Sequence, residues 1–457
     1  MTGPTVVPLV DEGLGNSTYL VDLGDGRAMA VDASRDLRDL RAAAARHGLT
    51  VAYAADTHLH ADFLSGACDL AATDGATVLA SAAGKREFPH TGLGDGDEVD
   101  LGGLRLRALT TLGHTDEHLA FLLLDGDAPV GVFSGGSLIV GAAARTDLVD
   151  PARTHELARA QYRSVQRLLT LPDHVALWPT HGVGSFCSAP PGAERTSSIG
   201  QERATNPLLR TRDEDTFVAA LLASLGTYPT YFDRLGEVNR RGPALLGSGP
   251  RLAPVTPDEA RRLLERGGAR DAVIVDVRPV EAFAAAHVTG SLSIPLRDAF
   301  ATWLGWVAPP DVPLLVVRDD DQDPNEVAWQ AAKVGCDNLV GELTGGFTMA
   351  AAAGLPTSST RLVQPGDVEG SQLLDVRQDA EFDAGHVPAA GHVELGGLSA
   401  GSHQVPAAVS VVMCGHGERA MTAASLLERA GRTGLAVLVG GPDEWSDEHG
   451  TPLDSSA

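Results

Sequence analysis

The C-terminal half of the chain repeats itself, and this repeat is the feature that most limits how the chain can fold. The segment AVIVDVRPVEAFAAAHVTGS (272–291) returns as QLLDVRQDAEFDAGHVPAAG (372–391). Each copy has an aspartate eleven residues before a histidine: Asp276 and His287, then Asp375 and His386. A period near 100 residues is too long for a solenoid unit and fits a duplicated domain. We therefore expect two similar α/β domains, over residues 255–357 and 358–457.

A larger domain precedes the repeat. At 457 residues the chain exceeds what one core usually supports, and typical domain sizes suggest about three domains. Short apolar strands such as VAYAAD (51–56) and LAFLLLD (119–125) alternate with helical patterns, and strands come before helices in each half. The Gly/Pro-rich segment 240–254 is the best linker candidate. These patterns predict an α/β domain over residues 1–245, with two sheets layered between helices.

Charge and composition exclude several classes of protein. The formal net charge is −25 and is spread along the chain, so nucleic acid and anionic membranes would be repelled. The N-terminus lacks the pattern of a signal peptide, and no apolar stretch approaches the length of a membrane span. We expect a cytoplasmic protein. The four cysteines are too scattered for a disulfide framework or a cysteine-based zinc site, so any important cysteine acts through its reactivity.

One cysteine lies in a loop that suits sulfur chemistry. The apolar strand 408–413 runs into Cys414 and then into a helical pattern. A cysteine at a helix N-terminus faces backbone N–H groups and the positive end of the helix dipole, which favour the thiolate. The loop between Cys414 and Arg419 is predicted to surround the substrate and consists of Gly415, His416, Gly417 and Glu418. Arg419 closes the loop and can hold an anion such as thiosulfate.

These residues resemble the rhodanese family, whose cysteine carries a sulfane sulfur as a persulfide. The DVR segment, the EF and GH pairs and the Cys-x-x-Gly-x-Arg loop carry the resemblance. Related phosphatases have one more residue in the loop, so the shorter loop favours sulfur over phosphate. The first repeat has Asp319 where the cysteine should be, followed by a longer acidic loop, and we expect it to be non-catalytic. Cys336 is expected to be a buried structural residue.

Three strand-end loops of the N-terminal domain carry histidines. THLHADF contains His58, His60 and Asp62, TTLGHTDEH contains His114, and LWPTHGVGSFC contains His181. Imidazole and carboxylate groups at the ends of strands are the ligands of transition metals. Three such loops in one domain therefore predict a metal site.

The loops resemble the metallo-β-lactamase superfamily, in which they converge on a metal at one edge of an αββα sandwich. GNSTYLVD, ARTD and NPLL sharpen the resemblance toward glyoxalase II and the persulfide dioxygenases. Two-zinc hydrolases of this family need a histidine where this chain has Phe63. Persulfide dioxygenases need one Fe(II), held by two histidines and an aspartate. The resemblance implies His58 and His114 as ligands, but Gly136 replaces the aspartate, so His60 or Asp62 would have to complete the site, with zinc as an alternative ion.

Other residues near these loops have more than one interpretation. We expect His181 to support the pocket rather than bind the metal, and Arg145 to order a loop. Asp62 can hydrogen-bond a ligand histidine or cap the helix that follows. Cys187 can pack in the interior or lie at the pocket mouth and accept sulfur. His118 is expected at the surface.

The resemblance implies an enzyme of sulfane-sulfur metabolism. The leading hypothesis is that a persulfide, such as glutathione persulfide, is oxidised to sulfite in the N-terminal pocket, while Cys414 exchanges sulfur with persulfide, sulfite and thiosulfate. Three alternatives remain open. The chain is a rhodanese only, with a metal-poor N-terminal binding domain; or a metal-dependent thioester hydrolase of the glyoxalase II type; or a non-enzymatic sulfur carrier or sensor. A homo-oligomer is compatible with each.

Overall fold

The computed structural model describes residues 4–187, 194–210, 213–265, 272–401 and 405–456. The chain forms two compact units. The first contains residues 1–249 together with 332–335, and the second contains 250–331 and 336–457. No helix within these described ranges is long and apolar enough to cross a membrane.

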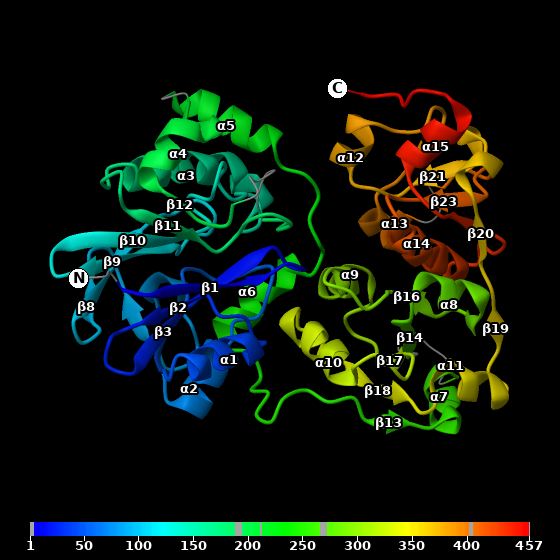
Figure 1. Cartoon of the computed structure of the whole chain (residues 1–457), viewed down its shortest axis with the longest axis horizontal. Helices are drawn as coiled ribbons and strands as arrows, with labels where there is room; N and C mark the ends of the chain where they lie inside the picture. Colours follow the sequence, from blue (N-terminus) through cyan, green and yellow to red (C-terminus); the bar gives the residue numbers. More distant parts are fainter. Residues whose placement is uncertain (1–3, 188–193, 211–212, 266–271, 402–404, 457) are drawn as a thin grey trace. The chain divides into compact units, whose positions relative to one another are not determined.

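Two six-stranded sheets form the centre of the first unit (Figure 1). In spatial order, the first sheet contains β1 (Val6–Asp11), β2 (Asn16–Asp22), β3 (Arg27–Val31), β4 (Thr50–Ala55), β5 (Thr77–Ser81) and β6 (Thr91–Leu93). The second contains β12 (Ser197–Ser198), β11 (Ala176–Pro179), β10 (Ala128–Gly135), β9 (Leu119–Asp125), β8 (Leu104–Thr110) and β7 (Glu98–Asp100).

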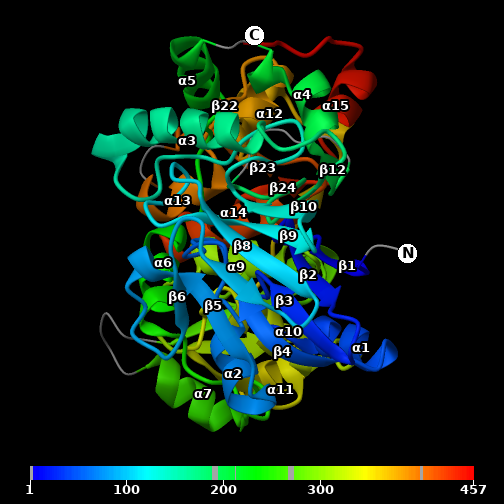
Figure 2. The same cartoon turned by 90° about the vertical axis from the view of Figure 1, so that its left-hand side faces the viewer.

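Helices cover the outer faces of both sheets, as Figures 1 and 2 show. Their bounds are α1 (Arg38–Arg46), α2 (Ala67–Asp74), η1 (Ala82–Gly84), η2 (Pro151–Arg153), α3 (Thr154–Leu168), α4 (Ile199–Thr205), η3 (Pro207–Leu209), α5 (Glu214–Ala223) and α6 (Phe232–Arg241). Helices α1 and α2 pack on the first sheet, and α3 and α5 pack on the second. The prediction of two sheets layered between helices is therefore confirmed.

The core between the sheets follows the alternation of the strands. Tyr19 and Val21 point inward from β2, and Phe121 and Leu123 point inward from β9, because every second residue of a strand faces the same side. The residues between them face the helices instead; Leu20, for example, packs in the cluster that contains α1 and α2. Both faces of the central strands are thus buried, and polar chemistry is left to the loops at the strand ends.

The second unit contains two sheets of the same topology. The first repeat has the order β13 (Pro254–Val255), β18 (Leu339–Leu343), β17 (Leu314–Val317), β14 (Val273–Asp276), β16 (Leu292–Ser293). The second has the order β20 (Arg361–Val363), β24 (Ala436–Leu438), β23 (Val411–Met413), β21 (Leu373–Asp375), β22 (Gly391–His392). The described pairings within both five-stranded sheets are parallel. The identical strand order confirms the duplicated domain.

Helices connect the parallel strands, as crossover connections require. In the first repeat they are α7 (Pro257–Leu264), α8 (Val280–Ala285), α9 (Phe300–Val307), α10 (Pro324–Lys333) and α11 (Gly346–Ala352), with a small sheet of β15 (His287–Val288) and β19 (Thr357–Ser358). In the second they are η4 (Pro365–Asp367), η5 (Gly370–Gln372), α12 (Asp379–Ala384), α13 (Leu395–Gly401), α14 (Glu418–Arg429) and α15 (Pro442–His449).

Buried ion pairs explain why both repeats keep an Asp-x-Arg segment. Arg278 binds Asp276 at 2.7 Å, and Arg377 binds Asp375 at 2.7 Å. Each arginine also donates to a backbone carbonyl eight residues further on, at Ala286 or Gly385. The pairs fix the turn after the central strand and leave the reactive chemistry to other residues.

Candidate metal pocket and sulfur-transfer loop

His58 lies in the loop after β4 and is completely buried. Its Nδ1 lies 2.8 Å from the hydroxyl of Thr57, and that hydroxyl donates to the carboxylate of Asp32 at 2.8 Å. Because the hydroxyl gives its one proton to Asp32, it accepts the proton of His58 Nδ1. We assign the proton from this hydrogen-bond network. The opposite nitrogen, Nε2, therefore carries a lone pair that can bind a metal ion.

His114 and His181 have the same protonation pattern. Nδ1 of His114 lies 2.7 Å from the backbone carbonyl of Arg145, which can only accept. Nδ1 of His181 lies 3.0 Å from Asn16 Oδ1 and 3.3 Å from Asp62 Oδ2. Burial lowers the pKa of His114 to about 3 and holds the pKa of His58 well below its usual range. His58 and His114 therefore stay neutral, as metal ligands must.

The three imidazoles fit a divalent metal ion. Each of His58, His114 and His181 offers a nitrogen within 4.8 Å of the other two, and all are buried. Nε2 of His58 and Nε2 of His181 are 3.4 Å apart, and neither carries a proton. Two buried lone pairs that face each other are unfavourable without a cation between them. Two metal–nitrogen bonds of about 2.0–2.1 Å at a tetrahedral angle would place the nitrogens roughly 3.3–3.4 Å apart.

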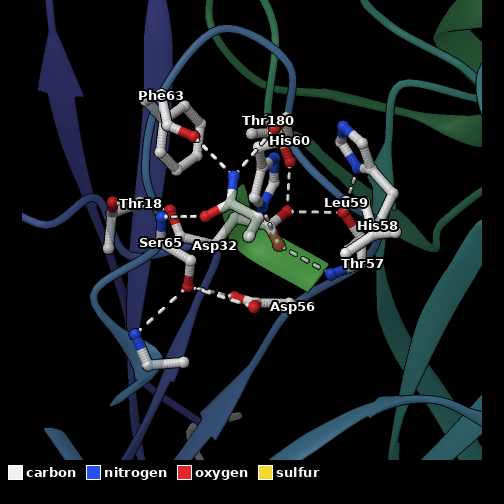
Figure 3. A network of polar contacts seen from close by, with 12 residues as sticks. Thr18, Asp32, Asp56, Thr57, His58, Leu59, His60, Phe63, Ser65 and Thr180 are labelled. Carbon is white, nitrogen blue, oxygen red and sulfur yellow. Dashed lines mark hydrogen bonds and ion pairs between the residues drawn. The ribbon is translucent and has the colours of Figure 1, made fainter. Parts of the chain in front are cut away.

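Asp32 organises a second polar network behind the histidines, shown in Figure 3. It follows β3 and accepts from the backbone N–H of Thr57 at 2.7 Å and from the hydroxyl of Thr180. His60 Nε2 lies 3.3 Å from Asp32 Oδ1. Burial opposes the charge on both groups, but their attraction outweighs it, so the pKa of Asp32 is lowered and the pKa of His60 is raised. His60, Asp32 and Asp56 form a separate group of possible ligands.

Phe63 closes the position where a second ion would need a histidine. Its ring stacks on the ring of His60, with centroids 4.2 Å apart and an interplanar angle of 23°. Phe63 is buried and has no donor atom. Phe63 therefore packs against His60 and cannot bind a metal ion.

Asp62 contacts His181 and does not cap a helix. Helix α2 begins at Ala67 with Gly66 as its N-cap, whereas the Asp62 carboxylate accepts from Asn16 Nδ2 at 2.8 Å and faces His181. The sequence is compatible with a helix cap or with a hydrogen bond to a histidine, and the structure shows the second of these contacts. Burial raises the pKa of Asp62, but the contacts with His181, His60 and Asn16 together outweigh burial and lower it to about 2.

Cys187 is completely buried beside this contact. Its sulfur belongs to one group of possible ligands with Asp62 and His181. Burial, with the nearby Asp62 charge, raises the pKa of its thiol well above the usual range.

Arg145 orders the neighbouring loop, as expected, because it donates to the carbonyl of Phe186 at 3.0 Å and binds Asp147 at 2.7 Å.

Two glycines leave room for the imidazoles. A Cβ on Gly136 would lie 2.4 Å from His114 Cδ2, and a Cβ on Gly135 would lie 2.4 Å from His118 Nε2. His118 is completely buried, and its Nε2 accepts from the backbone N–H of Gly136 at 3.0 Å. The expectation that His118 lies at the surface is therefore wrong. The hydrogen bond from the Gly136 loop holds it inside, and sequence periodicity alone does not reveal such a contact.

A cavity of about 570 Å³ lies beside the histidine loops. Leu59 and Ala61, which flank His60, line it together with Thr115, and Lys85 and Arg240 contribute cations. It gives a small organic molecule access to the loops that carry the imidazoles.

The Cys414 loop has the local geometry that the sequence predicts. Cys414 directly follows β23, and helix α14 begins four residues later at Glu418, with Gly417 as its N-cap at φ +103°. The backbone N–H of Gly417 donates to Cys414 Sγ at 3.1 Å. A donated N–H and the start of a twelve-residue helix both favour negative charge on this sulfur.

Arg419 is held by a carboxylate. Its two terminal nitrogens bind the two oxygens of Glu381 at 2.6 and 2.9 Å. Burial opposes the charge of Glu381, but the arginine outweighs it and lowers the pKa of that carboxyl. Arg419 thus ties the loop to α12, and binding of a substrate anion by the same guanidinium stays a prediction.

A cavity of about 270 Å³ lies at the loop and is lined by both repeats. His416, Gly417 and Glu418 line it from the second repeat, and Glu281, Arg297 and Gln322 line it from the first. In the first repeat, Gln322 donates to the carbonyl of Val277 at 2.7 Å, and its Oε1 accepts from Asp319 N at 2.9 Å. The loop at Asp319 is therefore folded by internal hydrogen bonds and offers no nucleophile.

Comparison with known proteins supports this division of the chain. The rhodanese-like domain family model matches residues 256–353 and 359–448. A hydroxyacylglutathione hydrolase of Rhodopseudomonas palustris (strain BisA53) is 30% identical over 242 residues, which are 52% of this chain and 86% of the relative. The N-terminal part of this chain belongs to the metallo-β-lactamase-fold family that contains the hydroxyacylglutathione hydrolases, and it is joined to two rhodanese-like domains.

Persulfide dioxygenases belong to the same set of homologues. The mitochondrial persulfide dioxygenase ETHE1 of Homo sapiens is 28% identical over 165 residues, 35% of this chain and 58% of the relative. A hydroxyacylglutathione hydrolase of Methylococcus capsulatus is 31% identical over 178 residues, 38% of this chain and 64% of the relative. The chain thus spans less than two thirds of the length of either protein.

A solved structure extends the likeness beyond the first unit. The metallo-β-lactamase from Staphylococcus aureus subsp. aureus COL matches with a TM-score of 0.65 and 27% identity, over 75% of this chain and 99% of its own.

Sequence reasoning found His58, His114, His181 and Cys414. It missed Asp32, Thr57 and Thr180, whose signal is weak: a carboxylate or hydroxyl directly after a buried strand.

Proposed function

We propose that this protein transfers sulfane sulfur through a persulfide on Cys414. The contact between Cys414 Sγ and Gly417 N at the start of α14 carries this proposal. The homology to rhodanese-like domains and persulfide dioxygenases supports sulfur metabolism generally. The cavity lined by His416, Gly417 and Glu418 supplies room for a small sulfur donor beside the Cys414 loop.

The transfer step is balanced without a further reagent. The Cys414 thiolate attacks the terminal sulfur of a donor R–S–SH. The new Cys414 S–S bond forms while the donor S–S bond breaks, and R–S⁻ leaves with the electron pair of that bond. The proton stays on the transferred sulfur, so the product is Cys414–S–SH. An acceptor such as sulfite or cyanide then takes the terminal sulfur and regenerates the thiolate.

The loop stabilises the charged sulfur before and after transfer. The Gly417 N–H and the helix dipole act on the thiolate, which lies buried within the loop. The Arg419–Glu381 pair keeps the loop in this conformation.

Replacing the nucleophile tests this proposal. Cys414→Ser should abolish sulfur transfer from an organic persulfide to cyanide and should prevent a mass increase of one sulfur on the protein. Cys336→Ser, which changes another buried cysteine of the same unit, should keep most of the rate. A Cys414→Ser protein that is folded by circular dichroism and still transfers sulfur at the wild-type rate would disprove the assignment.

We further propose that the N-terminal pocket oxidises a persulfide to sulfite, which the second unit then consumes. Three imidazoles suit one iron ion, and Phe63 leaves a dinuclear hydrolase without a ligand. A bound iron would supply the redox chemistry with O₂. The chain keeps the Nε2 lone pairs directed inward through Thr57, Arg145 and Asn16. Linking the units in one chain raises the effective concentration of sulfite at Cys414.

Metal analysis after anaerobic purification separates the candidate activities. We expect near-stoichiometric iron in the wild type, and loss of both iron and persulfide-dependent O₂ uptake in His58→Ala. His90→Ala, which changes a histidine outside the metal groups, should bind iron normally. Zinc in place of iron would favour a thioester hydrolase of the glyoxalase II type. Metal-free protein would leave the sulfurtransferase with a binding domain.

A further inference from the structure

The cavity at the Cys414 loop contains more negative than positive side chains. Glu281 from α8 and Glu418 from α14 line it, and Arg297 is the one arginine or lysine among the described residues that do so. Within the described part of the chain, the carboxylates of Glu281 and Glu418 have no ion-pair or hydrogen-bond partner. A substrate therefore meets two uncompensated negative charges and one positive charge.

Residues next to the cavity add further negative charge. Gln322, which lines it, stands between the exposed carboxylates of Asp321 and Asp323. Glu444 is near enough to His416 for an electrostatic attraction. The arginines that could offset these charges are already bound, because Arg318 pairs with Glu342 and Arg419 pairs with Glu381.

Apart from His416 and Gln322, most of the remaining lining is apolar. Val277, Leu296, Leu362 and Val437 form part of the wall. An inorganic dianion such as thiosulfate would lose hydration against these side chains, with too few donors to replace the lost water. An organic group gains from the same surface, since its apolar atoms leave water.

We infer that the sulfur donor of Cys414 is the persulfide of a small organic thiol whose organic part carries no net negative charge, and that thiosulfate is a poor donor. This inference rests on the proposed sulfur transfer and specifies its substrate. Repulsion from Glu281 and Glu418 rejects anionic donors, which is how a binding site gains specificity without new attractive contacts. Arg297 alone does not outweigh these two carboxylates. Sulfite, the acceptor proposed above, meets the same repulsion, and the high effective concentration that the linked first unit supplies offsets it.

Donors that differ in charge test the inference directly. The rate of Cys414 persulfide formation is measured by mass spectrometry with cysteamine persulfide, 2-mercaptoethanol persulfide, glutathione persulfide and thiosulfate. We expect kcat/KM to fall in that order, with thiosulfate at least on the order of tenfold below cysteamine persulfide. Added salt should raise the rate with thiosulfate and lower it with cysteamine persulfide, because salt screens both repulsion and attraction.

Matched variants connect this order to the two carboxylates. Glu281→Gln combined with Glu418→Gln should raise the ratio of kcat/KM for thiosulfate to kcat/KM for 2-mercaptoethanol persulfide by roughly tenfold. Glu265→Gln removes an exposed carboxylate of the same unit outside the cavity and should change neither value. If thiosulfate is as good a donor as cysteamine persulfide and salt slows it, the inference fails while sulfur transfer stands. If no donor labels Cys414, the proposed function fails and the inference with it.

Discussion

At the scale of single residues, Gly136 decides what the metal pocket contains. In the persulfide dioxygenases that the chain resembles, an aspartate would stand here and bind iron. In this chain the ring of His114 occupies the space that a side chain would need, because a Cβ on Gly136 would lie 2.4 Å from His114 Cδ2. His181 lies beside His58 instead and supplies a third nitrogen. Restoring the aspartate is therefore a steric problem as well as a question of charge.

We predict that Gly136→Ala and Gly136→Asp have separable effects. Both variants force His114 to move, so each should lower the free energy of unfolding by about 1–3 kcal/mol. Gly136→Ala should also lower iron occupancy. Gly136→Asp should regain iron relative to Gly136→Ala, since a carboxylate compensates the charge of the ion. Urea titration and metal analysis of the same samples measure both effects. Equal iron in the two variants would show that the carboxylate does not reach the ion.

The sequence predicts the histidine cluster better than the residues that support it. His58, His114 and His181 stand out because each follows a strand and a turn, but the sequence favours a supporting role for His181, whereas the structure places it among the possible ligands. Asp32, Thr57 and Thr180 are common residue types, and their role appears only when β3, β4 and β11 bring them together. The direction of a side chain, such as that of His60 toward Asp32, depends on hydrogen bonds between distant residues.

At the scale of elements, α14 serves two purposes. Its first turn follows the Cys414 loop, and its later turns contact the first repeat. Thr422 donates to the carbonyl of Ser293 at 2.7 Å, and Ser425 accepts from the backbone N–H of the same residue at 3.1 Å. Glu428 lies 3.2 Å from His287 Nε2 and accepts from Gly290 N at 3.0 Å. The first repeat thus contacts the helix that follows the Cys414 loop of the second repeat.

We predict that Glu428→Gln weakens the second unit in a pH-dependent manner. The contact with His287 lowers the pKa of Glu428, and the N–H of Gly290 lowers it further. Burial opposes both contacts without outweighing them, so the pKa lies below its usual range. A lowered pKa stabilises the fold above the unfolded-state value of about 4.3, and this contribution is lost as pH falls through the folded-state value. The loss in Glu428→Gln at pH 7 should be about 1 kcal/mol, because partial exposure screens the pair.

Urea unfolding at pH 7 and at a pH below the folded-state pKa measures this difference. The gap between wild type and Glu428→Gln should close at the acidic pH. Glu448→Gln, an exposed change on α15, provides the control and should show no gap at either pH. A gap of the same size at both pH values would mean that the carboxylate charge does not contribute.

At the scale of the whole molecule, the sequence predicts the architecture well. The internal repeat predicts two domains of one topology, and the strand orders β13-β18-β17-β14-β16 and β20-β24-β23-β21-β22 confirm it. The alternation of strands and helices predicts the layered N-terminal domain. The charges of the cavity could not be predicted, because Glu281, Arg297 and Glu418 come from separate segments that only the fold brings together.

The double role of α14 has a practical consequence for inhibition. A compound that wedges between α14 and the turn at His287–Gly290 would tilt the helix at its far end. The tilt would move the Gly417 N–H away from Cys414 Sγ, because helix and loop are continuous. Such a compound would make the Cys414 thiol less reactive without entering the cavity. It would therefore not compete with the sulfur donor for the same site.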